Sequence, residues 1–567
     1  MHLRRTRRTR LAVTAALTGA VLALSACSGG SSSEGQGPAG GSEPTTITVF
    51  NGSTGTIAEN WNPHSPTLLR PARGILYEPL FYYNITAPAG TEPEPILGTD
   101  WSWNEDGTEL TITTREGVTW SDGEPFTAAD VAFSLNLPNE HPELNASGFD
   151  GTAEATSDNT VVVRFPETSF VQEASVLGDN PILPEHVWSE LDPVTTINPD
   201  PVVTGPYTVA EFSPQSYVLA ANPNYWGGAP AVDRVRYIAL AGADAASAAL
   251  LAGDVDWMSS FFPGLQQLMA SNPELSWVNS PAFSTTFHTC ANADLGCTGP
   301  QTDVAVRQAI YHGIDRTQLN QLAFADLGAM PSPALLMPER DADWIADDIE
   351  LAPANADVAR ARSILEGAGW TMGGDGIYTR DGQRLTLNVQ VVSGYSDFIS
   401  AIEAMTQQLR EVGIELTSSQ LSYNEWAANE TNGTFQLSMD SIGPGPSTDP
   451  YFVYARKYAT STTAPVGQSA SSNNQVRYSN PVVDQEAIEA AAQMDDDAVK
   501  AEQYAIIQRE IARDMSYIPI IIGSTLTEFN NSRVTGWPTQ DDLYAFPASW
   551  KSWDNGIVLK NLQPAGQ

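Results

Sequence analysis

Lysine is the scarcest charged residue in this sequence. The 567 residues contain four of them, Lys457, Lys500, Lys551 and Lys560. Lysine and arginine together number 28 against 67 aspartates and glutamates, which gives a formal net charge of −39. A protein that binds nucleic acid needs a positive field to meet the phosphates, so we expect no nucleic-acid partner. We interpret the acidity as a solvating surface rather than as a site.

Long apolar runs are also lacking, with one exception at the N-terminus. Five arginines and no acid occupy residues 1–10, and residues 11–26 then carry no charge. This uncharged run is shorter than the roughly 20 residues that a membrane-spanning helix needs. A basic start, a short apolar segment and small residues at its end are typical of a secretory signal peptide, which we place at residues 1–26.

The signal segment ends in Leu-Ser-Ala-Cys27, which resembles the lipobox of bacterial lipoproteins. In that family the chain is cut before the cysteine, and the sulfur receives a diacylglycerol. Cleavage at an Ala-rich site without lipidation is the alternative. Residues 27–44 contain no large apolar side chain, so they predict a flexible tether. We therefore expect a protein anchored by lipid to the outer face of the cell membrane, on the extracellular or periplasmic side.

Histidine and cysteine are scarce as well, with six and three residues. The histidines are scattered, and the spacings that mark zinc sites, P-loops and serine hydrolases do not occur. No catalytic constellation emerges, so we expect a protein that is not an enzyme and has neither a cofactor nor a metal. Cys290 and Cys297 are close in sequence, and in an exported protein such a pair most often forms a disulfide.

Strand and helix patterns predict an α/β body with β-rich insertions. Residues 46–50 alternate as a half-buried strand does. Thr127 and Asp130 have the spacing of a capping box and predict the start of a helix. Further helices are expected at residues 357–368 and 484–515.

One stretch of the second half predicts a complete βαβ unit. Residues 385–392 form a strand pattern, apolar residues then recur at helical spacing up to Gly413, and residues 414–417 begin another strand. Ligands of open α/β sheets bind beyond the carboxyl ends of the strands. The loop at residues 393–395 is therefore expected beside a cleft.

A series of motifs runs in order along nearly the whole chain. The longest covers residues 101–134 and includes Gly-Val-Thr-Trp-Ser-Asp-Gly; shorter ones lie at 77–80, 204–207, 222–227, 251–256 and 306–310. In this combination they resemble the extracellular solute-binding proteins of family 5, which include dipeptide, oligopeptide and nickel binders. Most motif residues form turns, caps and packing contacts, so they identify the scaffold and say little about the solute.

The resemblance implies the two-lobed fold of class II periplasmic binding proteins, of the cluster C type, with an extra β-rich domain on the N-terminal lobe. We place the first lobe at residues 45–77, 181–280 and 531–567, the extra domain at 78–180 and the second lobe at 281–530. The resemblance also implies closure of the lobes over a solute and delivery to ABC permease subunits. We expect the protein to be a monomer.

The solute stays open at this point. Peptide binders of the family hold the ligand's amino terminus on a buried aspartate shortly before an Asp-Pro step, since a buried ammonium needs such a partner. Pro446 takes that position here, and Asp440 and Asp449 are the remaining acids nearby. Trp61 and Asn62 resemble the first loop of members that stack oligosaccharides on tryptophan. An oligopeptide is the first expectation, a cello-oligosaccharide the alternative, and a signalling lipoprotein without transport a remote one.

Nine residues are candidate ligand contacts, chosen from strand ends, loops and the region of the Asp-Pro step. They are Asn51, Trp61, Asn62, Phe287, Tyr395, Trp426, Asp440, Asp449 and Tyr451. Core packing or loop stabilisation is an equal interpretation for each of them.

Overall fold

The structure, a computed structural model, describes residues 44–145, 148–260, 264–470 and 473–566. The predicted signal peptide, Cys27 and nearly all of the tether lie outside the described residues. Among the helices in these ranges, none combines the length and the apolar character needed to cross a bilayer.

Seven strands form the sheet of the first lobe, in the order β12-β21-β11-β1-β10-β9-β8. Their bounds are β1 Thr46–Phe50, β8 Tyr207–Ser213, β9 Ser216–Ala221, β10 Arg234–Ile238, β11 Trp257–Met258, β12 Leu275–Asn279 and β21 Leu526–Asn530. The predicted first strand is confirmed: β1 lies in the middle, parallel to β10 and β11. Its alternating Ile47 and Val49 are fully buried in the largest apolar core, to which the C-terminal helix α15 (Ser552–Asn561) also contributes.

The extra domain is a four-stranded antiparallel sheet, in the order β4-β5-β7-β6, with one helix packed against it. Its elements are β4 Gly98–Trp103, β5 Glu109–Thr114, α1 Ala128–Glu140, β6 Thr152–Ser157 and β7 Thr160–Arg164. The capping box is confirmed, because Thr127 accepts a hydrogen bond from the Ala129 N–H at 3.3 Å and Asp130 accepts one from the Thr127 N–H at 2.9 Å.

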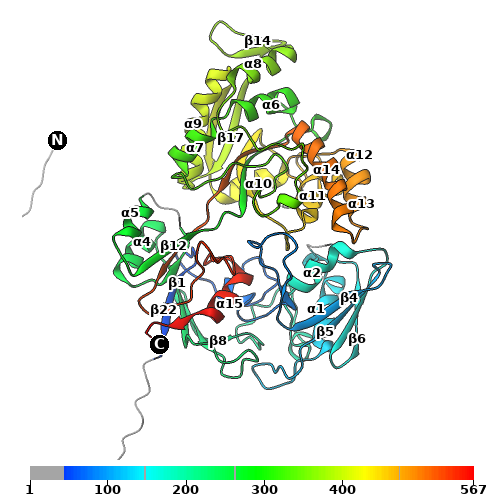
Figure 1. Cartoon of the computed structure of the whole chain (residues 1–567), viewed down its shortest axis with the longest axis vertical. Coiled ribbons are helices and arrows are strands. Elements are labelled where there is room, and N and C mark those ends of the chain that lie inside the picture. The colour runs from blue at the N-terminus through cyan, green and yellow to red at the C-terminus, as the bar shows by residue number, and fades with distance from the viewer. Residues whose placement is uncertain (1–43, 146–147, 261–263, 471–472, 567) are drawn as a thin grey trace, which may run out of the picture. The chain divides into compact units, whose positions relative to one another are not determined.

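Five strands form the sheet of the second lobe, in the order β18-β17-β19-β13-β20, and helices α6 to α9 lie around β17 (Figure 1). The strands are β13 Phe283–Thr289, β17 Thr386–Val392, β18 Glu415–Leu421, β19 Leu437–Ile442 and β20 Tyr517–Gly523. The main helices are α6 Val304–Gly313, α7 Arg316–Ala323, α8 Val358–Gly367, α9 Ser396–Val412, α10 Tyr423–Asn432, α11 Tyr451–Tyr458 and α14 Asp497–Asp514.

The predicted βαβ unit is confirmed in this lobe. Strands β17 and β18 are parallel, with Thr386 opposite Glu415, and α9 connects them. Gly413 ends α9 at a φ of 107°, a conformation that favours glycine. The predicted disulfide between Cys290 and Cys297 is also present and closes the loop after β13.

Two segments carry the chain between the lobes. One leads from β12 into β13 and the other from β20 into β21, and the Ser280 N–H donates to the Thr525 carbonyl at 2.9 Å where they run together. Strand β21 pairs with β12 and β11 of the first lobe. The expected end of the second lobe at residue 530 is therefore too late, because Leu526–Asn530 belongs to the first-lobe sheet.

The helix expected at residues 484–515 is interrupted. A short π-helix (Asp484–Ile488) and one turn, α13 (Glu489–Ala491), precede a separate helix, α14. Asp496 caps α14 by accepting hydrogen bonds from the Ala498 and Val499 N–H groups. An aspartate side chain favours this capping position over a helix interior, which explains the break.

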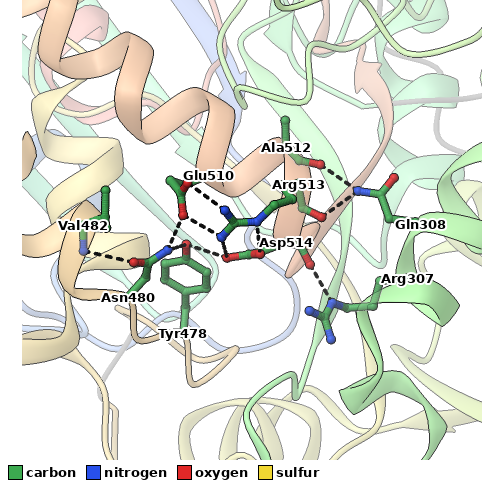
Figure 2. A network of polar contacts seen from close by, with 9 residues as sticks. All are labelled: Arg307, Gln308, Tyr478, Asn480, Val482, Glu510, Ala512, Arg513 and Asp514. Carbon is green, nitrogen blue, oxygen red and sulfur yellow. Dashed lines mark hydrogen bonds and ion pairs between the residues drawn. The ribbon is translucent and has the colours of Figure 1, made fainter. Parts of the chain in front are cut away.

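The end of α14 is fixed by side chains of α6 (Figure 2). Arg307 donates to the Asp514 carbonyl at 2.8 Å, and Gln308 donates to the carbonyls of Ala512 and Arg513, both at 2.8 Å. These bonds occupy carbonyls that a helix end leaves without a partner inside the helix. The chain then turns at Met515, where φ is 47°, and runs into β20. Strand β20, which leads into one of the two segments between the lobes, therefore starts from a fixed point.

Candidate functional site

Three cavities lie along the boundary where the second lobe meets the first lobe and the extra domain. We call them the hinge cavity, the central cavity and the outer cavity; their volumes are about 260, 180 and 540 Å³. Phe283, Phe546 and Trp550 form an aromatic cluster to which Ile85 packs. Phe283 and Trp550 line the hinge cavity, and Ile85 lines the central one. Helix α11 contributes to both the central and the outer cavity.

The hinge cavity contains one carboxylate among aromatic rings, beside the crossing residues Ser524 and Thr525. Its main lining residues are Phe283, Thr285, Phe324, Asp397, Phe398, Ser441 and Trp550. Burial raises the pKa of Asp397, and the backbone N–H of Phe398 partly opposes that rise. Within the described ranges no side chain donates a hydrogen bond to this carboxylate. Asp397 lies in the first turn of α9, where the helix dipole favours a negative charge.

The central cavity contains two cations and two acids. Arg456 of α11 and Lys551 approach it from opposite lobes, and Tyr82, Tyr83, Gly178, Asp179, Pro446, Trp553 and Asp554 complete most of its wall. Asp179 accepts a hydrogen bond from the Trp553 indole at 3.0 Å. Asp554 accepts bonds from the Tyr82 hydroxyl at 2.6 Å and the Phe546 N–H at 3.0 Å. Burial raises the pKa of Asp554, and Lys551 opposes that rise.

The outer cavity is lined by hydroxyl, amide and carboxylate side chains. Its polar residues are Glu167, Thr168, Thr460, Ser461, Thr462, Asp484, Gln485, Glu489 and Gln493, and Tyr451 supplies the aromatic surface. The π-helix contributes three of the lining residues, and such helices are frequent at functional sites. Asp484 is held in place by the backbone N–H and the hydroxyl of Thr460, at 2.7 and 2.6 Å.

The structure contradicts a ligand contact for Trp61, Asn62 and Phe287, because none of their surface is exposed. Trp61 packs edge-on against Tyr217, with ring centroids 5.2 Å apart, inside the first-lobe core. Asn62 donates to two backbone carbonyls, those of Pro193 and Thr196, and thereby stabilises its loop. Phe287 packs in the core of the second lobe.

Three more predicted contacts are occupied by bonds within the protein. Asn51 donates to the Tyr217 hydroxyl at 3.3 Å, and the Trp426 indole donates to the Ser438 hydroxyl at 2.9 Å. Asp449 pairs with Lys500 at 3.0 Å and accepts bonds from the Tyr504 hydroxyl and the Tyr451 N–H. Its carboxylate therefore stabilises the segment before α11 rather than a solute.

The remaining three predicted residues differ in how close they lie to the cavities. Tyr451 lines the outer cavity. Tyr395 is 43% exposed, and its ring centroid lies 5.9 Å from that of Phe398, which lines the hinge cavity. Asp440 lies outside the lining of the three cavities, near the buried His288–Glu430 pair, whose atoms are 3.0 Å apart. Burial raises the pKa of Asp440, and His288 opposes that rise.

Sequence reasoning missed the charged residues of the hinge and central cavities. Asp397 lies two residues after the loop at residues 393–395, which was expected beside a cleft, so the sequence did carry a signal for it. Arg456, Lys551 and Tyr83 come from three distant parts of the chain. No local pattern joins them. In the described ranges, no group of three or more His, Cys, Asp or Glu side chains is arranged to hold a metal ion.

Comparison with known proteins gives one consistent result. Residues 92–464 match the family model described as bacterial extracellular solute-binding proteins, family 5 Middle. The chain is 31% identical to Protein XP55 of Streptomyces lividans over 421 residues, which cover 73% of each chain.

Solved structures show the same fold. One is the periplasmic oligopeptide-binding protein of an oligopeptide ABC transporter from Thermotoga maritima, with a TM-score of 0.83 and 22% identity over 92% of this chain and 99% of that one. A second structure of that protein, with mannohexaose bound, gives a TM-score of 0.79 at 22% identity, over 93% of this chain and 100% of that one. The similarity covers both lobes and the extra domain.

Proposed function

The chain belongs to the bacterial extracellular solute-binding proteins of family 5, and from that premise we propose that its solute is an oligopeptide. It is the solute-binding component of an ABC importer. The peptide would lie in the three cavities at the lobe boundary and be delivered to the permease subunits after the lobes close.

The observation that carries the peptide proposal is the hinge cavity. A buried ammonium needs an anionic partner, and ring faces stabilise a cation further. The hinge cavity offers both, because Asp397 has no side-chain donor in the described structure and Phe283, Phe398 and Trp550 form its walls. The amino terminus of a peptide fits this environment. A neutral sugar would leave the carboxylate without a counter-charge.

Hinge closure supports capture and release. Each cavity is lined from both sides of the boundary, so a solute contacts both sides only when they are close together. Binding then shifts the population toward the closed form. The two crossing segments, joined by the Ser280–Thr525 hydrogen bond, are the connections about which such a motion takes place.

We also propose that Cys27 carries the lipid that holds the protein at the outer face of the membrane. The support is the signal segment, the lipobox-like Leu-Ser-Ala-Cys27 and the Gly- and Ser-rich residues that follow. A receptor on such a tether stays near its permease and still reaches the solution.

An oligosaccharide is the second candidate solute, and the outer cavity favours it. Hydroxyl, amide and carboxylate side chains beside Tyr451 suit the alternating polar edges and apolar faces of sugar rings. The Thermotoga maritima protein, described as oligopeptide-binding, has mannohexaose bound in one of its structures. The solute class therefore needs a direct test.

A thermal-shift screen against defined tri- to pentapeptides and against cello- and manno-oligosaccharides separates the two classes. A ligand that binds only the folded protein raises its melting temperature with concentration. A rise with peptides alone supports the proposal, and a rise with oligosaccharides alone replaces it with the second candidate. Uptake of the bound ligand by a strain that lacks the protein adds a second test. If the purified protein binds the ligand but the strain without it takes up that ligand normally, a signalling role is favoured.

A further inference from the structure

We propose that Arg456, Lys551 and Tyr83 form a carboxylate-binding subsite in the central cavity. The inference rests on the proposed function in that the cavities hold the solute, and it adds the chemistry of one end of that solute. The cavity of about 180 Å³ is smaller than the roughly 300 Å³ at which complete ligand pockets begin. It therefore suits one group of a larger ligand.

The two cations are the first observation. In the described part of the chain, no carboxylate oxygen lies within 4.0 Å of the Arg456 guanidinium or the Lys551 ammonium, and neither donates a hydrogen bond to a protein group. The other three lysines differ: Lys500 pairs with Asp449 at 3.0 Å, Lys560 pairs with Glu94 at 3.5 Å, and Lys457 donates to Gln475 at 3.1 Å.

This lack of ion pairs and donated hydrogen bonds in the described residues is unexpected in a chain with 67 acids and 28 lysines and arginines. Both cations are half-buried, and they reach the cavity from opposite lobes. An anion between them would draw the lobes together. Charged donors also give the stronger hydrogen bonds to a carboxylate, and arginine adds a planar fork that matches its two oxygens.

Tyr83 is an independent second observation. Its hydroxyl is buried without a hydrogen-bond partner, although the residue lines the cavity. A buried hydroxyl that lacks a partner costs stability, so a ligand atom that accepts its proton would be favoured. Burial, with Glu173 nearby, raises the pKa of Tyr83 well above its ordinary value, so the hydroxyl stays a donor.

The ring of Tyr83 is positioned by a glycine. A Cβ atom on Gly178 would lie 2.5 Å from the Cδ2 atom of Tyr83, so any other residue there would push the ring away. Gly178 is itself part of the cavity wall. The close approach of ring and backbone holds the unpaired hydroxyl beside the cavity.

The two acids of the cavity do not remove its preference for an anion. Asp179 and Asp554 accept hydrogen bonds from Trp553, Tyr82 and the Phe546 N–H, as described above. Burial shifts Asp554 toward its neutral form. The three proposed residues therefore offer hydrogen-bond donors that no protein group in the described ranges uses. A carboxylate, with two acceptor oxygens, matches them.

The ligand that fits both ends is a zwitterion. Asp397 lines the hinge cavity together with Phe283 and Trp550, and the two cations line the central cavity together with Ile85, which belongs to the same apolar cluster. A short peptide would place its amino terminus at Asp397 and its carboxylate at Arg456 and Lys551. A carboxylate of a metal chelate is the other source of the same chemistry.

Isothermal titration with the purified protein tests the subsite. The probes are trialanine to pentaalanine as free acids and as C-terminal amides, and citrate alone. We expect amidation to weaken binding roughly tenfold or more, and Arg456→Gln and Lys551→Gln to abolish the difference between acid and amide. Tyr83→Phe should reduce that difference. Lys560→Gln, which changes the same charge outside the cavity, is the matched control and should retain it.

The outcomes separate the subsite from the proposed function. Equal binding of acid and amide overturns the subsite while peptide capture stands. Binding of citrate but of no peptide, with loss in Arg456→Gln and Lys551→Gln, supports the subsite and contradicts peptide capture. Binding of none of the probes contradicts both. Unchanged melting temperatures of the ligand-free variants show that folding is intact, which we expect because in the described part of the chain neither cation forms an ion pair within 4.0 Å or donates a hydrogen bond.

Discussion

Ser280 donates its backbone N–H to the carbonyl of Thr525 at 2.9 Å, and this bond joins the two segments by which the chain passes between its lobes. Strands β12 and β21 pair on one side of it, and strands β13 and β20 pair on the other. Two adjacent strands thus continue from one sheet into the next. The hinge cavity borders the same point, because Ser524 and Thr525 line it, so a solute bound there would contact one of the two crossing segments.

Trp61→Ala should destabilise the ligand-free protein by about 3 to 5 kcal/mol, because it removes a fully buried ring from the first-lobe core. Urea unfolding followed by circular dichroism measures this. Tyr423→Ala is the control: Tyr423 is 59% exposed, and its loss should cost within about 0.5 kcal/mol. If Trp61→Ala keeps the stability of the wild type but loses solute binding, Trp61 is a ligand contact and the prediction is wrong.

The contrast between Trp61 and α9 shows what the sequence could supply. The apolar stripe of α9 and the Gly413 stop define that helix locally, so strand, helix and strand were all predicted. Trp61 lies in a loop without periodicity, and only the packing of Tyr217 against it decides that it is core. The subsite residues Tyr83, Arg456 and Lys551 meet through the tertiary fold, which no local pattern encodes.

Glu528→Gln should stabilise the protein near neutral pH. Glu528 is fully buried, one of its carboxylate oxygens has no hydrogen-bond partner, and burial raises its pKa well above the ordinary value. Such a group destabilises the fold increasingly as the pH rises from its pKa in the unfolded chain to its pKa in the folded chain, and the full penalty remains at higher pH. Each pKa unit of the rise corresponds to about 1.4 kcal/mol.

Melting temperatures between pH 4 and pH 8 test this prediction. The gain of Glu528→Gln over wild type should be near zero at about pH 4, where the wild-type carboxyl is largely protonated in both states, and should grow as the pH rises. A constant difference across the range would show that ionisation of Glu528 does not affect stability. Exposed Glu403, replaced by Gln, is the matched control.

The double variant Cys290→Ser, Cys297→Ser should lose about 2.5 kcal/mol, since the disulfide closes a short loop and constrains the unfolded chain. The loss should be equalled by adding a reductant to the wild type. Two free thiols in the oxidised wild-type protein, measured by thiol labelling under denaturing conditions, would contradict the pairing.

Cys27→Ala should move the protein from the membrane fraction to the soluble exported fraction. The proposed diacylglycerol on the Cys27 sulfur would be lost together with the thiol. Immunoblots of fractionated cells measure the distribution, and mass spectrometry of the wild type detects the lipid. The double serine variant of Cys290 and Cys297 should stay in the membrane fraction. Membrane retention of Cys27→Ala would contradict the anchor.

The affinity of Asp397→Asn for a peptide with and without its ammonium tests the proposed function most directly. Isothermal titration of the wild type should give binding of a free peptide that weakens roughly tenfold to a hundredfold on N-acetylation, about 1.4 to 2.8 kcal/mol. Asp397→Asn should bind the free peptide as weakly as the acetylated one, while Glu403→Gln on the same helix should behave as the wild type. Equal affinities of wild type and Asp397→Asn for the free peptide would contradict capture of a peptide ammonium in the hinge cavity.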